Sequence, residues 1–338
     1  MSEPPAQTSA PAPSRRDAGP GLRVVALGGG HGLSASLAAL RRVREVGELT
    51  AVVTVADNGG SSGRLRGEFG CLPPGDLRQA LAALCEDDEW GSTWAQVLQH
   101  RFRTDGGLDQ HAVGNLLIVA LWELLGDHVT GLDWVAGLLG ARGRVLPMSL
   151  LPLDIAATIE GVDPASPAAV TTVRGQVQVA STSGRVLGVE LDPQEPPACP
   201  EALRAVQEAD WVVLGPGSWY TSVIPHLLVP ELRQALEQAR GRTLVVLNLA
   251  AQSGETEGYG PETHLDVLAA HAPHLRVDHV LADPATVSDP ALLAEAAAGL
   301  GAVLTVADVA RGDGTPRHDA GKLADAFAGV LAAPRSAT

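Results

Sequence analysis

The sequence predicts an α/β fold with a doubly wound, mostly parallel sheet, a helical cover and a small β-rich insertion. Short apolar runs that suit buried strands alternate with segments of helical periodicity near both ends of the chain, and this alternation specifies a parallel sheet with crossover helices. The middle of the chain holds one helical block and one block of short alternating runs. We therefore expect the 338 residues to form one α/β body with an insertion.

The first βαβ unit begins at residue 22. Leu22–Leu27 is an apolar, β-branched run that stops at three glycines, and Leu33–Val46 has apolar residues at helical spacing. Leu49–Val55 is a near-continuous apolar run of the kind that a parallel sheet buries on both faces. The α/β core is expected to contain residues 22–70 and 210–331.

The middle of the chain interrupts this core. Residues 74–140 have helical periodicity, with candidate helices at Leu77–Cys85, Trp94–Phe102, Ala112–Leu125 and Leu132–Leu139. Residues 145–200 contain short alternating runs, among them Gly175–Ala180 and Arg185–Leu191, which predict a β-rich insertion. Strand patterns then resume at Trp211–Leu214, Thr243–Leu247, His279–Leu281 and Ala302–Val306, before a last helix at Ala320–Leu331.

Composition limits the function classes. A formal charge of -15 without a dense Lys/Arg block argues against nucleic-acid binding, which needs a basic surface.

Residues 1–20 are rich in Pro, Ala and Ser and lack the apolar segment of a signal peptide, so we expect a disordered tail there and a second tail at residues 332–338. No uncharged apolar stretch reaches the roughly 18 residues that span a bilayer. We expect a cytoplasmic protein without membrane insertion, with Cys71, Cys85 and Cys199 as reduced thiols.

Glycines follow the first strand. Gly30, Gly32 and Ala35 fit the G-x-G-x-x-A spacing loosely, and glycines let a backbone approach a phosphate at the start of a helix. Packing between strand and helix explains such a turn equally well. Phosphate binding and packing both stay open at this loop.

The second strand ends in Asp57, in the position where a dinucleotide fold puts a ribose-binding carboxylate. Asp57 could instead bind a metal ion or cap the next turn. The loop Gly59–Gly63 resembles an anion nest, with Arg64 and Arg66 as charge partners.

The segment after this loop carries further charge. Asp76 is a candidate N-cap, and Arg78 in the first helical turn opposes the helix dipole, so it calls for a ligand phosphate or Asp57 as its partner. His111 and Asn115 open a very apolar helix, where a hydrogen-bonded core pair and a ligand contact are equally compatible with the pattern.

The later strand ends add hydroxyls and amides. Ser218, Thr221 and Ser222 could donate to phosphate oxygens, and a serine nucleophile lacks a His–Asp pair at suggestive spacing. The uncharged groups Asn248, Gln252 and Thr256 suit a base or sugar edge, and Tyr259 could stack on a base. Arg317 and Lys322 either add positive charge to the site or lie on a solvated surface.

Four segments together resemble the YvcK family of the CofD-like superfamily. They are GGG-x-GLS, ADNGGSSGRLR followed by PPGDLR, GPGSWYTS, and N-x-x-x-Q-x-GET, and their order along the chain agrees with the family. The resemblance runs from about Val24 to Leu323. It implies a Rossmann-like, CofD-like domain over residues 21–331.

The resemblance also implies a function. Members of this family are called gluconeogenesis factors; they bind UDP-sugars such as UDP-N-acetylglucosamine, support cell shape, envelope synthesis and growth on gluconeogenic carbon sources, and are not defined by a catalytic activity or a required cofactor. We therefore assign no catalytic residue. Together with Arg64 and Arg78 from the loops above, the expected ligand-binding residues are Gly29, Gly30, Gly32, Ser34, Asp57, Asn58, Ser61, Ser62, Gly217, Ser218, Asn248, Tyr259 and Arg317.

The alternative function is a metal-dependent transferase of phosphorus-containing groups. The related CofD enzymes transfer a phospholactyl group from a guanosine diphosphate-type donor, and here Asp57, with Asp76, would hold Mg²⁺. His31 stands where the family usually has Thr, which bears on ligand preference. The apolar helix at Ala112–Leu125 is compatible both with a homo-oligomer interface and with a buried core. A factor of this kind is also expected to act through an envelope-synthesis or metabolic partner protein.

Overall fold

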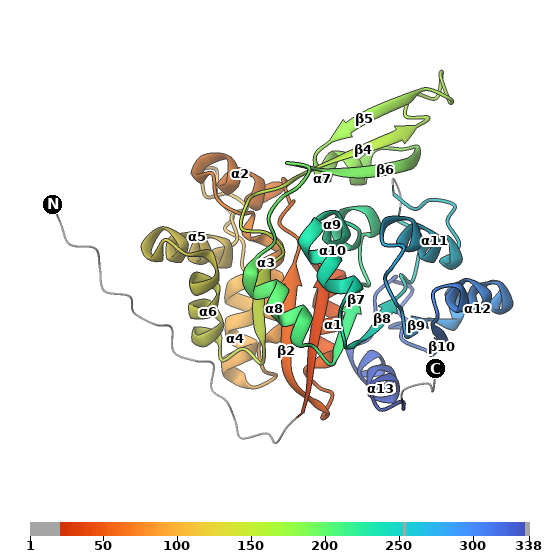
Figure 1. The fold of residues 1–338 in the computed structure, drawn as a ribbon. Coiled ribbons are helices and arrows are strands. Elements are labelled where there is room, and N and C mark those ends of the chain that lie inside the picture. The colour runs from red at the N-terminus through yellow and green to blue at the C-terminus, as the bar shows by residue number, and fades with distance from the viewer. Residues whose placement is uncertain (1–20, 253–254, 335–338) are drawn as a thin grey trace.

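The structure is a computed structural model that describes residues 21–252 and 255–334, and its largest element is a seven-stranded sheet (Figure 1). The strand order is β10-β9-β8-β7-β1-β2-β3, and all pairs are parallel. The strands are β1 (Leu22–Gly28), β2 (Val46–Val53), β3 (Arg144–Pro147), β7 (Trp211–Leu214), β8 (Arg242–Val246), β9 (His279–Ala282) and β10 (Val303–Val306). The predicted doubly wound α/β fold is confirmed.

Helices cover both faces of this sheet, which explains the continuous apolar runs of its central strands. Residues Val24–Leu27 of β1 are all buried. α1 packs against α3 and α13, while α8 and α10 pack together over the other face (Figure 1). The helices of the core are α1 (Gly30–Leu40), α8 (Pro200–Glu208), η1 (Trp219–Val223), α9 (Pro225–Leu228), α10 (Pro230–Glu237), α11 (Pro261–His271), η2 (Pro284–Thr286), α12 (Pro290–Gly299) and α13 (Ala320–Leu331).

The predicted helical cover lies between β2 and β3 in sequence. It contains α2 (Gly60–Phe69), α3 (Pro74–Leu84), α4 (Glu89–Gln99), α5 (Val113–Leu125) and α6 (His128–Leu139). Gly114 shows how closely these helices pack, because a Cβ there would lie 2.7 Å from the Leu98 side chain and 2.8 Å from that of Arg78.

The β-rich insertion forms a separate antiparallel sheet in the order β5-β4-β6. Its elements are β4 (Asp154–Glu160), β5 (Val170–Arg174), α7 (Gln176–Ser181) and β6 (Arg185–Asp192). The expected start at residue 145 differs from the structure, because β3 pairs with β2 in the large sheet. The strand predicted at Gly175–Ala180 is wrong: this segment is α7, whose Val177 amide donates to the side chain of Asn58 at 3.1 Å. The two residues are 119 positions apart in the sequence. The contact therefore gives no signal in the local hydrophobic pattern from which α7 could be predicted.

The topology fixes where a ligand can bind. From β1 the chain builds outward through β2 and β3, and it then returns to place β7 on the other side of β1. The sheet therefore has its switch point between β1 and β7, and ligands of such sheets bind outside the carboxyl ends of the strands there. The small sheet and α7 stand above this edge (Figure 1).

None of the helices in the described residues is long and apolar enough to cross a bilayer. The predicted tail at residues 1–20 lies outside the described residues, and so do residues 335–338 of the tail predicted at 332–338. α13 ends at Leu331, as predicted.

Candidate functional site

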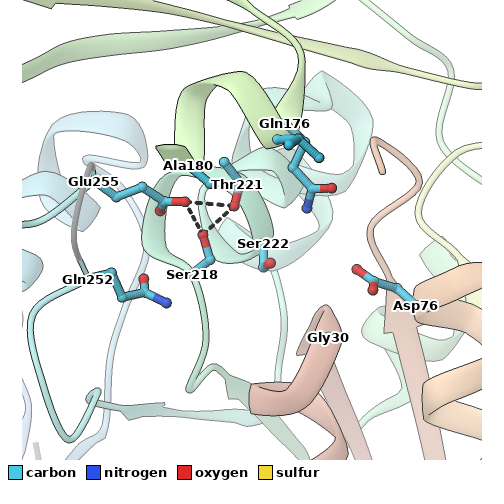
Figure 2. Close-up of a pocket in the computed structure, with 10 residues that line it drawn as sticks. Gly30, Asp76, Gln176, Ala180, Ser218, Thr221, Ser222, Gln252 and Glu255 are labelled. Carbon is cyan, nitrogen blue, oxygen red and sulfur yellow. Dashed lines mark hydrogen bonds between the residues drawn. The ribbon is translucent and has the colours of Figure 1, made fainter. Parts of the chain in front are cut away.

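A cavity of about 280 Å³ lies at the switch point. Its walls come from the β1–α1 turn, α3, η1 and the loop after β8, and α7 of the insertion forms its roof (Figure 2). The lining residues are Gly30, Asp76, Gln176, Val177, Ala180, Ser218, Thr221, Ser222, Gln252 and Glu255. We call this space the switch-point cavity.

The predicted glycine turn reaches the cavity at Gly30, but much of it serves packing. A Cβ on Gly32 would lie 2.2 Å from the carbonyl oxygen of Pro216, and one on Gly29 would lie 2.6 Å from the carboxylate of Asp76. Ser34 donates to the carbonyl of Gly30 at 2.8 Å. The turn therefore locks β1 against the β7 loop and offers the cavity mainly the backbone of Gly30.

Asp76 is the buried acid of this site. Burial and the nearby charge of Asp57 raise the pKa of Asp76 to about 7, although the Gly30 amide and the Arg78 guanidinium oppose this shift. The prediction that Asp76 caps α3 is wrong, because the cap position is Pro73 and no side chain caps this helix. Asp57 accepts the amide of Gly59 at 2.8 Å, in agreement with the capping alternative.

The glycine-rich loop after Asp57 is not an open nest, because Gly60 already begins α2. Gly63 donates to the carbonyl of Gly59 at 2.9 Å, so its amide belongs to the helix. Ser61 is buried and contacts His111 at 3.1 Å and Asn115 at 3.0 Å. These contacts favour the core-pair interpretation of His111 and Asn115.

Ser62 is buried too, and it lies directly against α3. A Cβ on Gly75 would approach the Ser62 hydroxyl to 2.3 Å. The glycine of the PPGDLR segment is therefore needed so that α2 and α3 can meet.

A second cavity, of about 540 Å³, lies at the start of α2. We call it the α2 cavity; it is lined by Asn58, Gly60, Gly63, Arg64, Asp109 and Gln110. Arg64 is exposed and donates to the carbonyl of Asp109 at 2.6 Å. Arg66 does not belong to this cavity, because it bonds Leu153 and Asp154 at the base of the insertion.

Arg78 is buried, and its guanidinium donates to the side chain of Gln99. Burial, with the nearby Arg101, lowers the pKa of Arg78 to about 10, while Asp76 and Asp57 act in the opposite direction. The expected partner Asp57 thus acts on this cation through its charge, whereas the hydrogen bond of the guanidinium goes to Gln99.

The hydroxyls after β7 are paired within the protein. Ser218 donates to Glu255 at 2.5 Å, Thr221 donates to the same carboxylate oxygen at 2.9 Å, and the two hydroxyl oxygens lie in contact with one another (Figure 2). Sequence reasoning missed Glu255, although the G-E-T at the end of the fourth motif was its one visible signal.

Asn248 and Gln252 hold the loops that bear these groups. Asn248 accepts the amide of Gly217 and donates to its carbonyl, both at 2.8 Å. The side chain of Gln252 accepts the amide of Trp219 at 3.2 Å and also lines the cavity. The side chain of Gln252 therefore holds the start of η1 in place and also presents an amide to the cavity.

Tyr259 and Arg317 lie outside the linings of both cavities. The hydroxyl of Tyr259 contacts that of Tyr220 at 3.1 Å, and its ring meets His264 edge to face. Arg317 is exposed in the loop between β10 and α13. Lys322 anchors that loop through Asp308, at 2.9 and 2.8 Å from the two carboxylate oxygens.

Metal binding has limited support in the site. In residues 21–252 and 255–334, no group of three or more His, Cys, Asp or Glu side chains could hold a metal ion. Asp57 and Asp76 are the neighbouring carboxylates that could contribute ligands.

Comparison with known proteins gives the family. The family model described as 2-phospho-L-lactate transferase CofD matches residues 24–321. The chain belongs to the CofD family. A curated relative from Mycobacterium tuberculosis named putative gluconeogenesis factor is 51% identical over 312 residues, which cover 91% of this chain and 90% of the relative. A gluconeogenesis factor of Halalkalibacterium halodurans is 36% identical over 318 residues, covering 90% and 95% of the two chains.

A solved structure supports the same assignment. A UPF0052 family protein from Bacillus halodurans has a TM-score of 0.80 and 34% sequence identity to this chain, covering 92% of it and 99% of the solved chain. The resemblance to the gluconeogenesis factors of the CofD-like superfamily, and the fold that it implied, are confirmed.

Proposed function

We propose that this CofD family member binds a UDP-sugar such as UDP-N-acetylglucosamine and acts in the cytoplasm as a non-catalytic factor. In this role it supports cell shape, envelope synthesis and growth on gluconeogenic carbon sources. The observation that supports the proposal best is the switch-point cavity, since open α/β sheets bind nucleotide ligands at that position. The names of the curated relatives agree with a role in gluconeogenic growth.

The two cavities suit a ligand with distinct chemical parts. They adjoin at the hydrogen bond between Asn58, which lines the α2 cavity, and Val177, which lines the switch-point cavity. A nucleotide sugar combines a base, an anionic diphosphate and a neutral sugar. The carboxylates, amides and hydroxyls of one cavity and the arginine of the other offer complementary groups for these parts.

A second candidate function is the CofD-like transferase. It is favoured by the match to the CofD model and by the placement of Asp57 and Asp76 near Arg78. In this alternative the carboxylates would hold Mg²⁺, which neutralises charge as a phosphorus-containing group is transferred.

Calorimetric titration of the full chain with UDP-N-acetylglucosamine, with and without Mg²⁺, tests the proposal. Mass spectrometry of the ligand after incubation then shows whether it is intact. We expect saturable, Mg²⁺-independent binding of a ligand that stays unchanged. Binding that requires Mg²⁺, together with ligand breakdown, would instead support the transferase.

Variants test the predicted residues that lie outside the cavities. Arg317→Ala is expected to weaken binding, and Tyr259→Phe keeps the ring while removing its hydroxyl. Arg233→Ala on α10 is the matched control, because Arg233 is an exposed arginine on a different surface. Equal affinities of Arg317→Ala and Arg233→Ala would remove Arg317 from the proposed site.

A further inference from the structure

Carboxylates of the protein itself face the starts of the two helices that the switch point would offer to a phosphate. At the start of α1, the carboxylate of Asp76 lies against the glycine backbone: a Cβ on Gly29 would come within 2.6 Å of it and one on Gly30 within 3.9 Å. At the start of η1, the amide of Tyr220 donates to Glu255 at 3.1 Å. Helix starts next to glycine turns bind anions when their amides are free, whereas here a buried acid already stands at each of the two starts.

Glu255 also takes the hydroxyl donors of this wall. One oxygen of its carboxylate accepts from Ser218 and Thr221, and the other accepts the Tyr220 amide. Only 4% of Glu255 is exposed. The carboxylate therefore stands where an incoming phosphate would need these donors.

The charge around the cavity opposes a second anion. Its lining includes Asp76 and Glu255 but no Arg, Lys or His. The nearby guanidinium of Arg78 is buried and bonded to Gln99. In a partly buried site, a like charge within several ångströms costs far more than it does in water.

The same groups suit a neutral, hydroxyl-rich ligand. Sugar hydroxyls are donors that a carboxylate or an amide oxygen accepts, and Asp76, Glu255 and Gln252 present such acceptors to the cavity. Gln176 in the roof adds an amide that can both donate and accept.

We infer that the switch-point cavity receives the uncharged sugar ring of a nucleotide sugar, and that the buried carboxylate of Glu255 excludes sugars that carry a carboxylate of their own. The diphosphate then lies toward the α2 cavity, which is lined by the exposed guanidinium of Arg64; one nitrogen of this group donates to the Asp109 carbonyl. The inference rests on the proposed function and adds to it the class of sugar.

The test compares UDP-glucose with UDP-glucuronic acid, which differ in charge only at C6 of the sugar, and uses UDP as a third ligand. Calorimetry on the full chain should give UDP-glucose at least about tenfold tighter binding than UDP-glucuronic acid. Glu255→Gln should reduce this ratio to about threefold or less, because it removes one charge and retains the shape. Glu257→Gln is the matched control, because Glu257 is an exposed carboxylate of the same loop.

The outcomes separate the inference from the proposed function. Equal affinity of the unsubstituted protein for the two UDP-sugars would overturn the inference and leave UDP-sugar binding standing. The same conclusion would follow if UDP bound as tightly as UDP-glucose, since the sugar would then add nothing. Failure of all three ligands to bind would overturn both. The ligand comparison needs no variant, so it decides the question even if Glu255→Gln does not fold.

Discussion

The two cavities beside the Asn58–Val177 contact differ in charge and in the pairing of their polar groups. The switch-point cavity has two buried carboxylates whose donors come from the protein itself. The α2 cavity has an exposed arginine and the start of a helix. The difference teaches that a glycine- and hydroxyl-rich loop in a Rossmann-like fold need not be a phosphate site, because internal acids can occupy it.

The largest effect is expected where the switch point is packed most tightly. Gly32→Ala would place a Cβ 2.2 Å from the carbonyl oxygen of Pro216, a backbone atom that cannot move aside. We expect a loss of about 3 kcal/mol or more in the free energy of unfolding, measured by urea denaturation. Gly67→Ala in α2 has open space and should be neutral or stabilising by up to about 1 kcal/mol. Equal stability of the two variants would show that the joint between β1 and β7 is looser than described.

The buried acid gives a pH test of the same region. Between the ordinary aspartate pKa of 3.8 and the raised value of about 7, the folded protein holds a proton on Asp76 that the unfolded chain has released. Stability should therefore fall as pH rises from about 4 to about 7, by an amount on the order of a few kcal/mol, and then level off.

Asp76→Asn isolates this contribution. Its urea midpoint should change less with pH than that of the unsubstituted protein, whereas Asp105→Asn, at an exposed position, should leave the profile as it was. Parallel profiles for the Asp76→Asn variant and the unsubstituted protein would contradict the shifted pKa of Asp76.

Breaking the contact between the two cavities is expected to have a smaller effect on stability. Asn58→Ala removes the bonds to the Val177 amide and to the Gln178 side chain. We expect a stability loss of about 1 kcal/mol and faster amide hydrogen exchange in residues 176–181. Thr172→Ala, on the exposed strand β5, should leave this exchange as it was. Unchanged exchange in α7 would mean that Asn58 does not hold the roof.

The α2 cavity should show the smallest effect on stability. Arg64→Ala removes an exposed side chain, so the free energy of unfolding should change by no more than about 0.5 kcal/mol. If the diphosphate lies there, the same variant should weaken UDP-sugar binding by about threefold to tenfold and reduce its dependence on salt. Binding indistinguishable from that of Arg233→Ala would place the diphosphate elsewhere.

Local patterns predicted the core strands and the last helix well, because each reflects the burial of a continuous apolar run or stripe. They failed at α7 and α2, which depend on contacts with distant segments. Asn58 bonds α7, and Gly63 exists so that α2 can pass the Asn58 carbonyl, which would lie 2.0 Å from a Cβ. The candidate site shows the same limit of local patterns. The motifs indicated its glycines and hydroxyls, but they did not indicate that Glu255 is the partner of the hydroxyls.

The sequence by itself determined the parallel α/β body, the order of the motifs that follow its strands, and membership of the CofD family. It could do so because apolar periodicity and motif spacing are local properties. Only the tertiary structure decided that Asp76 and Glu255 meet at one cavity and that Arg64 belongs to another. The reason is electrostatic as well as geometric, since the charge that a site presents depends on which distant side chains share its buried volume.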